Sequence, residues 1–266
     1  MHHSKTMRTT AALALLLVSM TVNAEPCVNE NDESRVTGTS QCLLAHRFGT
    51  PPAPHLLVWL HGDGSGGKPA RYHLPIAEKA VETFGAGNVI SVGLIRPGYP
   101  DGSGDASSVA PGHGGRSDHY TRENVSEVAS AIRNLKKRYA TKRVTVIGHS
   151  GGAATTAIML GMEPDLIDSA LLVSCPCDLV AWRTGRRAWT RSENPMDWAE
   201  KIPATTRIVA LTGSRDDNTI PDLAKRYVDA LLSRGVPARF LEVPDTTHND
   251  ALSAKEVNEA IAELIR

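Results

Sequence analysis

Short apolar runs alternate with helical runs along most of this chain, and this alternation constrains the fold more than any other feature. The apolar runs are rich in aliphatic and β-branched side chains and cover residues 55–60, 88–95, 143–147, 169–174, 207–211 and 238–243. Such runs are typical of strands buried on both faces of a parallel sheet. The helical runs cover residues 69–84, 124–139, 151–160, 221–232 and 251–265. The alternation predicts an α/β fold whose doubly wound, mostly parallel sheet carries helices on both faces.

The beginning of the chain predicts export. Lys5 and Arg8 precede an apolar stretch over residues 11–20, and Val-Asn-Ala at 22–24 has the small residues that a signal peptidase reads. Residues 1–24 are therefore expected to be a secretory signal peptide and residues 25–266 a single mature domain, secreted or periplasmic. The alternative is a membrane anchor, but the apolar stretch is too short to span a bilayer comfortably. We expect no membrane span after cleavage.

Charge and cysteine content add two expectations. The chain has 29 basic and 29 acidic residues, so nothing in the charge balance indicates nucleic acid as a partner. An oxidising compartment favours a disulfide between Cys27 and Cys42, which flank a polar loop. Cys175 and Cys177 lie only two residues apart, so either a strained disulfide or two reduced thiols fits the spacing. A redox role is weakly supported, because redox pairs usually have two intervening residues.

One pentapeptide carries the chemistry. Gly148-His149-Ser150-Gly151-Gly152 follows the third apolar run and opens the third helical run. The pattern G-x-S-x-G between a strand and a helix predicts a sharp turn that exposes the serine hydroxyl at the carboxyl end of the sheet. The alternative is a glycine-rich turn that packs closely and does no chemistry. We expect Ser150 to be a nucleophile.

A second glycine-rich segment precedes the expected nucleophile. His61-Gly62-Asp63-Gly64 comes directly after the first apolar run, where a loop can aim a backbone amide at a developing oxyanion. The expected donors are the amides of Asp63 and Gly151. An ordinary turn at the end of a strand is the alternative.

The expected acid and base follow in the order that this strand–turn–helix arrangement uses, serine first and histidine last. Asp216 and Asp217 come after the fifth apolar run, and His248 follows the sixth. Asp216 lies three residues after Gly213, the usual spacing, whereas Asp217 is better spaced from Pro221. We favour Asp216 as the partner of His248 and keep Asp217 as the alternative acid.

These motifs resemble those of the α/β-hydrolase superfamily, and the resemblance runs from about Leu56 to the last residue. Gly-His-Ser-Gly-Gly-Ala at 148–153 and Gly-Ser-Arg-Asp-Asp-Asn at 213–218 look most like the prolyl-oligopeptidase-like and dienelactone-hydrolase-like branches. Two features depart from the pattern. No large propeller precedes the domain, and Ser-Cys-Pro-Cys at 174–177 has no assignment from the family.

The residues together predict a serine hydrolase that forms an acyl-enzyme on Ser150, with His248 as base and Asp216 orienting it. This mechanism requires no metal and no organic cofactor. The leading substrate is a small or medium carboxylic ester, and a short peptide is the alternative because peptidases use the same triad. A non-catalytic binding protein on this scaffold is less consistent with an intact triad. A thiol redox protein built on Cys175 and Cys177 is a further alternative.

Other residues are candidates for the rim of the site. Tyr99 and Trp182 are possible substrate-lining residues, and residues 176–203 are expected to form a small cap or loop insertion. Within this insertion lies a basic and aromatic cluster: Arg183, Arg186, Arg187 and Arg191, with Trp182 and Trp189. The cluster could bind an anionic or aromatic group of the substrate, or it could form a solvated helix. His113, Asp118 and His119 lack regular ligand spacing, so we expect no metal there.

Overall fold

The structure is a computed structural model that describes residues 27–29, 32–64 and 68–266. The predicted signal peptide, residues 1–24, lies outside the described residues. In the part of the chain that is described, no helix is both long and apolar enough to cross a membrane.

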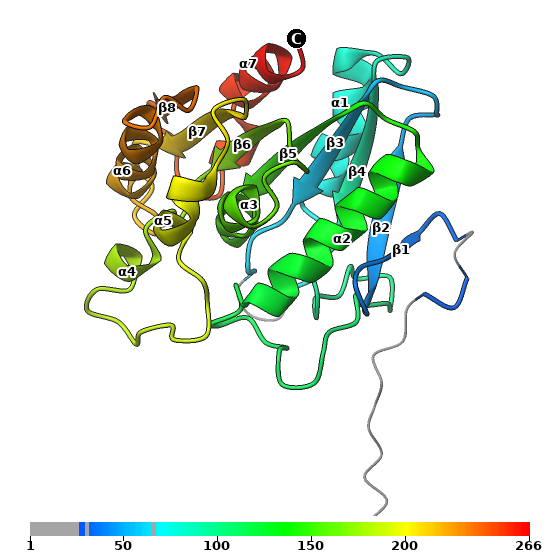
Figure 1. The fold of residues 1–266 in the computed structure, drawn as a ribbon, viewed down its shortest axis with the longest axis horizontal. Helices are drawn as coiled ribbons and strands as arrows, with labels where there is room; N and C mark the ends of the chain where they lie inside the picture. Colours follow the sequence, from blue (N-terminus) through cyan, green and yellow to red (C-terminus); the bar gives the residue numbers. More distant parts are fainter. Residues whose placement is uncertain (1–26, 30–31, 65–67) are drawn as a thin grey trace, which may run out of the picture.

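An eight-stranded sheet forms the centre of the molecule (Figure 1). Its strands are β1 (Arg35–Thr37), β2 (Cys42–Phe48), β3 (His55–Leu60), β4 (Val89–Leu94), β5 (Arg143–His149), β6 (Ser169–Val173), β7 (Arg207–Gly213) and β8 (Ala238–Val243). The order across the sheet is β1-β2-β4-β3-β5-β6-β7-β8. Strands β3 to β8 run parallel, whereas β1 and β2 pair antiparallel. The sheet confirms the predicted doubly wound, mostly parallel architecture.

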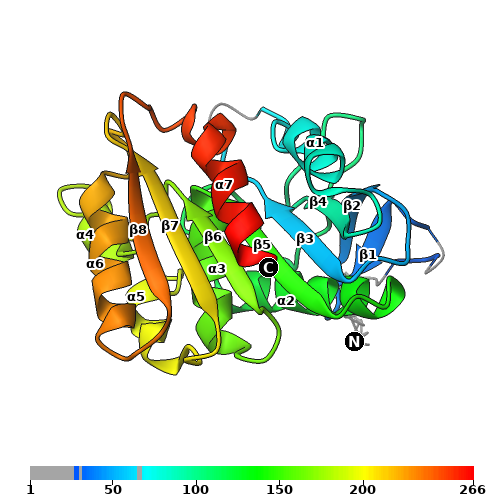
Figure 2. The ribbon, with the colours of Figure 1, turned by 90° about the horizontal axis from the view of Figure 1, so that it is seen from above.

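The two edges of the sheet differ from the prediction. Strands β1 and β2 at one edge were not predicted, because β1 has only three residues and β2 is buried on one part of its length only. At the other edge lies β8 (Figure 2), which was expected to be buried on both faces. Most of its residues are half-buried, because only one strand, β7, flanks it. A sequence rule for strands that are buried on both faces therefore does not describe the strands at the edges of a sheet correctly.

Helices cover both faces of the sheet. The helical elements are α1 (Leu74–Phe84), α2 (Arg122–Arg138), α3 (Gly151–Met162), α4 (Leu179–Trp182), α5 (Pro195–Trp198), η1 (Ala199–Lys201), α6 (Pro221–Leu232), η2 (Ala251–Ser253) and α7 (Lys255–Leu264). One apolar cluster joins α2, α3 and α6 to one face, and a second joins α1 and α7 to the other. Figure 1 shows α1 and α7 across the sheet from α2 and α3.

Helix α2 illustrates how the local sequence sets an element. Val125, Val128, Ile132 and Leu135 recur at helical spacing, and all four are fully buried against the sheet. The helix begins after Thr121, whose side chain accepts a hydrogen bond from the amide of Asn124 at 3.3 Å.

Parallel strands bring their carboxyl ends to one edge of the sheet. The loops that follow β3, β5, β7 and β8 meet there, and these loops carry the residues singled out by their motifs. Residues 176–203 form a largely irregular segment after β6 that contains the short elements α4, α5 and η1. The candidate site is therefore assembled from segments that are far apart in the sequence.

Candidate active site

Ser150 occupies a strained turn between β5 and α3. Its φ is 53°, in the left-handed region that side chains other than glycine rarely adopt. The flanking glycines make the turn possible. A Cβ on Gly148 would lie 2.5 Å from the carbonyl oxygen of Gly152, and one on Gly152 would lie 2.2 Å from that of Leu60. The backbone segments approach too closely for any larger residue, so the G-x-S-x-G pattern is a packing requirement here.

Three side chains from separate loops form a chain of contacts. His248 Nε2 lies 3.0 Å from Ser150 Oγ, and His248 Nδ1 lies 2.8 Å from Asp216 Oδ2. Asp217 is exposed and forms no hydrogen bond or ion pair with His248. Of the two candidate acids, the structure therefore places Asp216 against the imidazole. The distances suit transfer of the hydroxyl proton to His248.

Asp216 is held as a carboxylate by several donors. Asp216 Oδ1 accepts hydrogen bonds from the amides of Asn218 and Thr219 at 3.1 and 2.8 Å. Thr219 Oγ1 lies 2.9 Å from Asp216 Oδ2 and 3.0 Å from the carbonyl oxygen of Ser174. Burial alone would raise the pKa of Asp216, but the hydrogen bond and charge of His248 and the Thr219 amide lower that pKa below its ordinary value. Asp216 therefore remains ionised and can stabilise an imidazolium.

The loop after β3 lies against the nucleophile. A Cβ on Gly62 would come within 3.0 Å of Ser150 Cβ, and one on Gly151 would come within 2.1 Å of Asp63 Oδ1. Among the described residues, the amides of Asp63 and Gly151 have no hydrogen-bond acceptor. Both expected donors therefore lie beside Ser150 and are available to a ligand.

The carboxylate of Asp63 is bound beneath this loop. Asp63 Oδ1 accepts a hydrogen bond from the buried guanidinium of Arg96 at 2.7 Å, and Asp63 Oδ2 accepts one from the hydroxyl of Tyr120 at 2.6 Å. Tyr99 OH lies 3.4 Å from Asp63 Oδ1. Tyr99 was expected to line the pocket. The structure corrects this expectation, since only 1% of Tyr99 is exposed and its ring supports the charged network from below.

A hydrogen-bond network through His149 connects the loop after β3 to the loop after β8. This network was not predicted. Tyr72 OH accepts a hydrogen bond from the amide of Gly62 at 2.6 Å and lies 2.6 Å from His149 Nδ1. His149 Nε2 lies 3.0 Å from the carbonyl oxygen of His248. These roles require a neutral imidazole with its proton on Nε2. Burial, followed by the charge of His248, lowers the pKa of His149 to about 4 and so favours that form.

A cavity of about 760 Å³ opens onto Ser150 and His248. Its walls include Tyr72, Trp182, Trp189, Arg116, Asp217 and Leu252. Trp182 thus lies where the sequence placed it, at the rim of the candidate site, with its indole donating to the carbonyl oxygen of Asn218 at 2.7 Å. Arg116 was not predicted, because an arginine in a glycine-rich loop carries no pattern that indicates its direction. No group of His, Cys, Asp or Glu side chains in the described ranges is arranged to hold a metal ion.

Both cysteine pairs are oxidised. Cys27 and Cys42 form a disulfide next to β1 and β2. Cys175 and Cys177 also form a disulfide, which resolves the two alternatives left open by their spacing. Both cysteines of the second pair are fully buried, and they directly follow Ser174, whose carbonyl oxygen contacts Thr219. Neither cysteine of the second disulfide is among the residues that line the cavity at Ser150.

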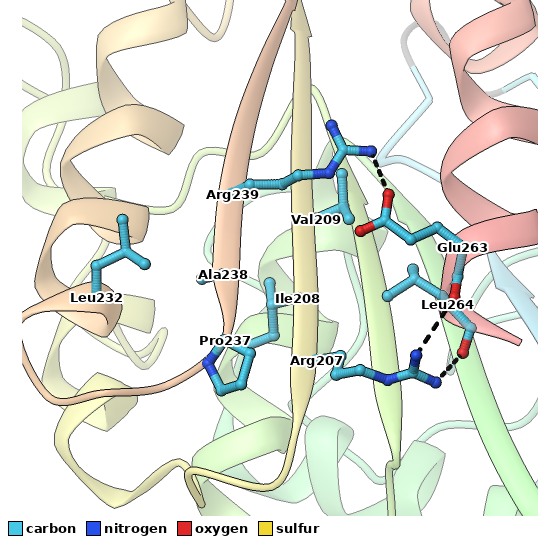
Figure 3. A pocket seen from close by; sticks show the side chains of 9 residues that line it. All are labelled: Arg207, Ile208, Val209, Leu232, Pro237, Ala238, Arg239, Glu263 and Leu264. Carbon is cyan, nitrogen blue, oxygen red and sulfur yellow. Dashed lines mark hydrogen bonds and ion pairs between the residues drawn. The ribbon is translucent and has the colours of Figure 1, made fainter. Parts of the chain in front are cut away.

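Another cavity lies at the opposite end of the sheet. It has a volume of about 240 Å³ and is lined at the amino ends of β7 and β8 by residues such as Ile208 and Pro237 (Figure 3). Arg239 pairs with Glu263 at 2.7 Å beside it. Its lining contains no serine, cysteine or histidine, so the cavity at Ser150 is the candidate active site.

Comparisons with known proteins agree with this geometry. A family model described as the prolyl oligopeptidase family matches residues 113–265. No curated protein sequence matches the chain significantly.

Solved structures show the same fold at low sequence identity. The esterase Est1E from Butyrivibrio proteoclasticus, solved with ferulic acid, has a TM-score of 0.63 and 15% identity, over 87% of this chain and 95% of the other. An esterase from Pyrococcus furiosus has a TM-score of 0.63 and 18% identity, over 87% of this chain and 88% of the other. Acylaminoacyl peptidase from Pyrococcus horikoshii has a TM-score of 0.61 and 11% identity, over 86% of this chain but only 39% of the other.

Proposed function

The chain belongs to the prolyl oligopeptidase family of serine hydrolases, and from this premise we propose that it hydrolyses small or medium carboxylic esters through Ser150, His248 and Asp216. The observation that carries the proposal is the continuous chain of contacts from Ser150 Oγ to Asp216 Oδ2, which opens onto a cavity beside two available amides.

The proposed reaction has two steps. His248 takes the proton of Ser150 as Oγ attacks the ester carbonyl, and Asp216 stabilises the resulting imidazolium. The amides of Asp63 and Gly151 donate to the oxyanion, an interaction worth a few kcal/mol per donor. His248 returns the proton to the leaving alcohol. Water, activated by the same histidine, then attacks the acyl-enzyme and releases the acid.

The likeness to two esterases supports the proposal. The chain spans nearly the whole length of these two proteins and less than half of the similar acylaminoacyl peptidase. A peptidase acting on short peptides is the second candidate, because Asp217 lines the cavity and its carboxylate has no ion-pair partner in the part of the chain that the structure describes. Such a carboxylate could bind the amino group of a peptide.

We further propose that the enzyme is exported. The signal-peptide pattern of residues 1–24 supports export, as do two disulfides, which persist in oxidising compartments. Mass spectrometry of the mature N-terminus in an exporting host tests cleavage before Glu25.

The function is tested with residues 25–266 on p-nitrophenyl esters of graded chain length and on peptide p-nitroanilides. We expect ester turnover that is lost in Ser150→Ala, and labelling of Ser150 by a fluorophosphonate probe. Preferential cleavage of the anilides, reduced by Asp217→Asn, would establish the peptidase instead. A protein that hydrolyses neither panel and is not labelled would contradict both proposals.

A further inference from the structure

The charged side chains that line the cavity differ in whether an oppositely charged side chain balances them. Asp63 lines the cavity, but its charge is balanced by Arg96, and its carboxylate also accepts a hydrogen bond from the hydroxyl of Tyr120. Arg116 and Asp217 also line the cavity, and neither forms an ion pair with another described residue. Arg116 is therefore the one arginine or lysine of the described cavity wall, and no carboxylate of a described residue pairs with it.

Arg116 is held in a defined place beside the nucleophile. Its Nη1 donates to the carbonyl oxygens of Asp63, Gly64 and Lys68 at 3.3, 3.3 and 3.2 Å. Its guanidinium lies over the ring of Tyr99, with its central carbon 5.0 Å from the ring centre. These contacts tie Arg116 to the same loop that carries the Asp63 amide, so its position relative to Ser150 is preorganised.

The contacts of Arg116 use only part of its hydrogen-bonding capacity. A guanidinium has five N–H donors, and only Nη1 has acceptors among the described residues. The carbonyl oxygens that it binds carry no net charge. A half-buried guanidinium with free N–H groups in a cavity is matched best by a carboxylate, which can accept two parallel hydrogen bonds.

The basic cluster of the cap does not serve this purpose. Arg183 lies over the rings of Trp182 and Trp189, at 5.1 and 5.2 Å from their centres. It lines a neighbouring cavity of about 360 Å³, which shares Trp189 with the cavity that contains Ser150, and it does not line the latter. The sequence indicated the cap arginines as candidate binders of an anionic group. In the structure, Arg116 is the arginine that lines the cavity at Ser150.

We infer that Arg116 determines specificity and binds a carboxylate of the substrate, so that the preferred substrates are esters that carry a negative charge. This inference rests on the proposed esterase function. The carboxylate belongs on the Arg116 side of the cavity, because Asp217 on the acid loop would repel it. The tryptophan wall, formed by Trp182 and Trp189, contacts the apolar part of the same molecule.

Two pairs of chromogenic esters test the inference. In the first pair the charge is on the acyl group: p-nitrophenyl hydrogen adipate is compared with its neutral methyl ester. In the second pair it is on the alcohol: a ring-carboxylated o-nitrophenyl butyrate is compared with o-nitrophenyl butyrate. We expect kcat/KM to favour the anionic member of at least one pair by about tenfold or more, and added salt to reduce that preference.

Variants identify the residue responsible. Arg116→Gln should abolish the preference, because it should lower kcat/KM for the anionic members about tenfold more than for their neutral partners. Arg116→Lys should restore part of the preference, because it keeps the charge but not the planar fork. Arg183→Gln is the matched control, which should keep the full preference because Arg183 lines the neighbouring cavity and not the one that contains Ser150.

The possible failures are distinguishable. Neutral turnover with no preference for either anionic ester would overturn the inference and leave the esterase standing. An equal loss on neutral and anionic members in Arg116→Gln would also overturn it, since Arg116 would then only support the loop. Absence of turnover on all four esters would contradict the esterase function itself.

Discussion

Ser150 lies between two polar networks, the oxyanion side around Asp63 and the acid side around Asp216. The two networks balance a negative charge in different ways. On the oxyanion side, Asp63 is bound by the buried cation of Arg96 and by Tyr120. On the acid side, Asp216 is bound by Thr219 and by backbone amides, with no arginine or lysine in contact among the described residues. The negative charge is compensated permanently on the first side. On the acid side, the negative charge of Asp216 is balanced only when His248 takes up a proton during the reaction.

This difference matches the proposed tasks of the two sides. The oxyanion side has to hold a backbone amide still, and a compensated buried ion pair does this without changing during the cycle. The acid side has to stabilise an imidazolium that exists only transiently. A permanent cation beside Asp216 would reduce that stabilisation. The predictions below test whether the two sides separate in this way.

The largest effect is expected on the acid side. Asp216→Asn should lower kcat for a neutral p-nitrophenyl ester by about 10⁴-fold, because the amide favours the wrong tautomer of His248. Asp217→Asn is the adjacent control and should stay within about threefold, since Asp217 does not contact His248. Comparable losses in the two variants would contradict the assignment of the acid.

On the oxyanion side the main effect is on stability. Arg96→Met should lower the free energy of unfolding by about 3 kcal/mol, because it leaves the carboxylate of Asp63 without its buried partner. Urea unfolding measures the change. Arg133→Gln removes a pair with Glu163 on the surface and should cost less than about 1 kcal/mol. If the two variants cost the same, the ion pair does not support the oxyanion side.

Acid should destabilise the protein through the histidine that joins the two sides. The pKa of His149 falls from 6.5 to about 4, mainly because the residue is buried. Between these values the unfolded chain binds a proton that the folded chain excludes, so stability is full above pH 6.5 and falls as the pH falls. The loss is on the order of 3 kcal/mol for His149.

Urea unfolding at pH 7 and pH 5 measures this pH dependence. His149→Gln should reduce the slope, although buried His61, whose pKa is also lowered by burial, leaves part of it. An unchanged slope in His149→Gln would assign the acid sensitivity to other groups.

The smallest effect is expected at Thr219. Thr219→Val removes the hydroxyl that lies between Asp216 Oδ2 and the carbonyl oxygen of Ser174 while keeping the volume of the side chain. We expect kcat to fall about tenfold, the value of one well-placed hydrogen bond. Steady-state kinetics on the neutral ester measure this change. A loss as large as that of Asp216→Asn would make Thr219 an essential part of the acid side.

The sequence predicted the framework of the fold more fully than the site. Six of the strands carry short apolar runs and the main helices carry periodic apolar patterns, and α6 begins and ends at the predicted residues, Pro221 and Leu232. Helix α1 begins at Leu74, later than the predicted start at residue 69. Strands β1 and β2 were missed because a short or one-sided edge strand buries too few residues to leave such a pattern.

What the sequence alone determined is the set of motifs at strand ends: Ser150 on its turn, then an acid and a histidine in the order of the fold. The tertiary structure decided which acid contacts His248, that Tyr99 lies beneath the site, and that Arg116 enters the cavity. The physical reason is that periodicity records burial along one element. The direction of a loop side chain depends instead on contacts between segments that are far apart in the chain.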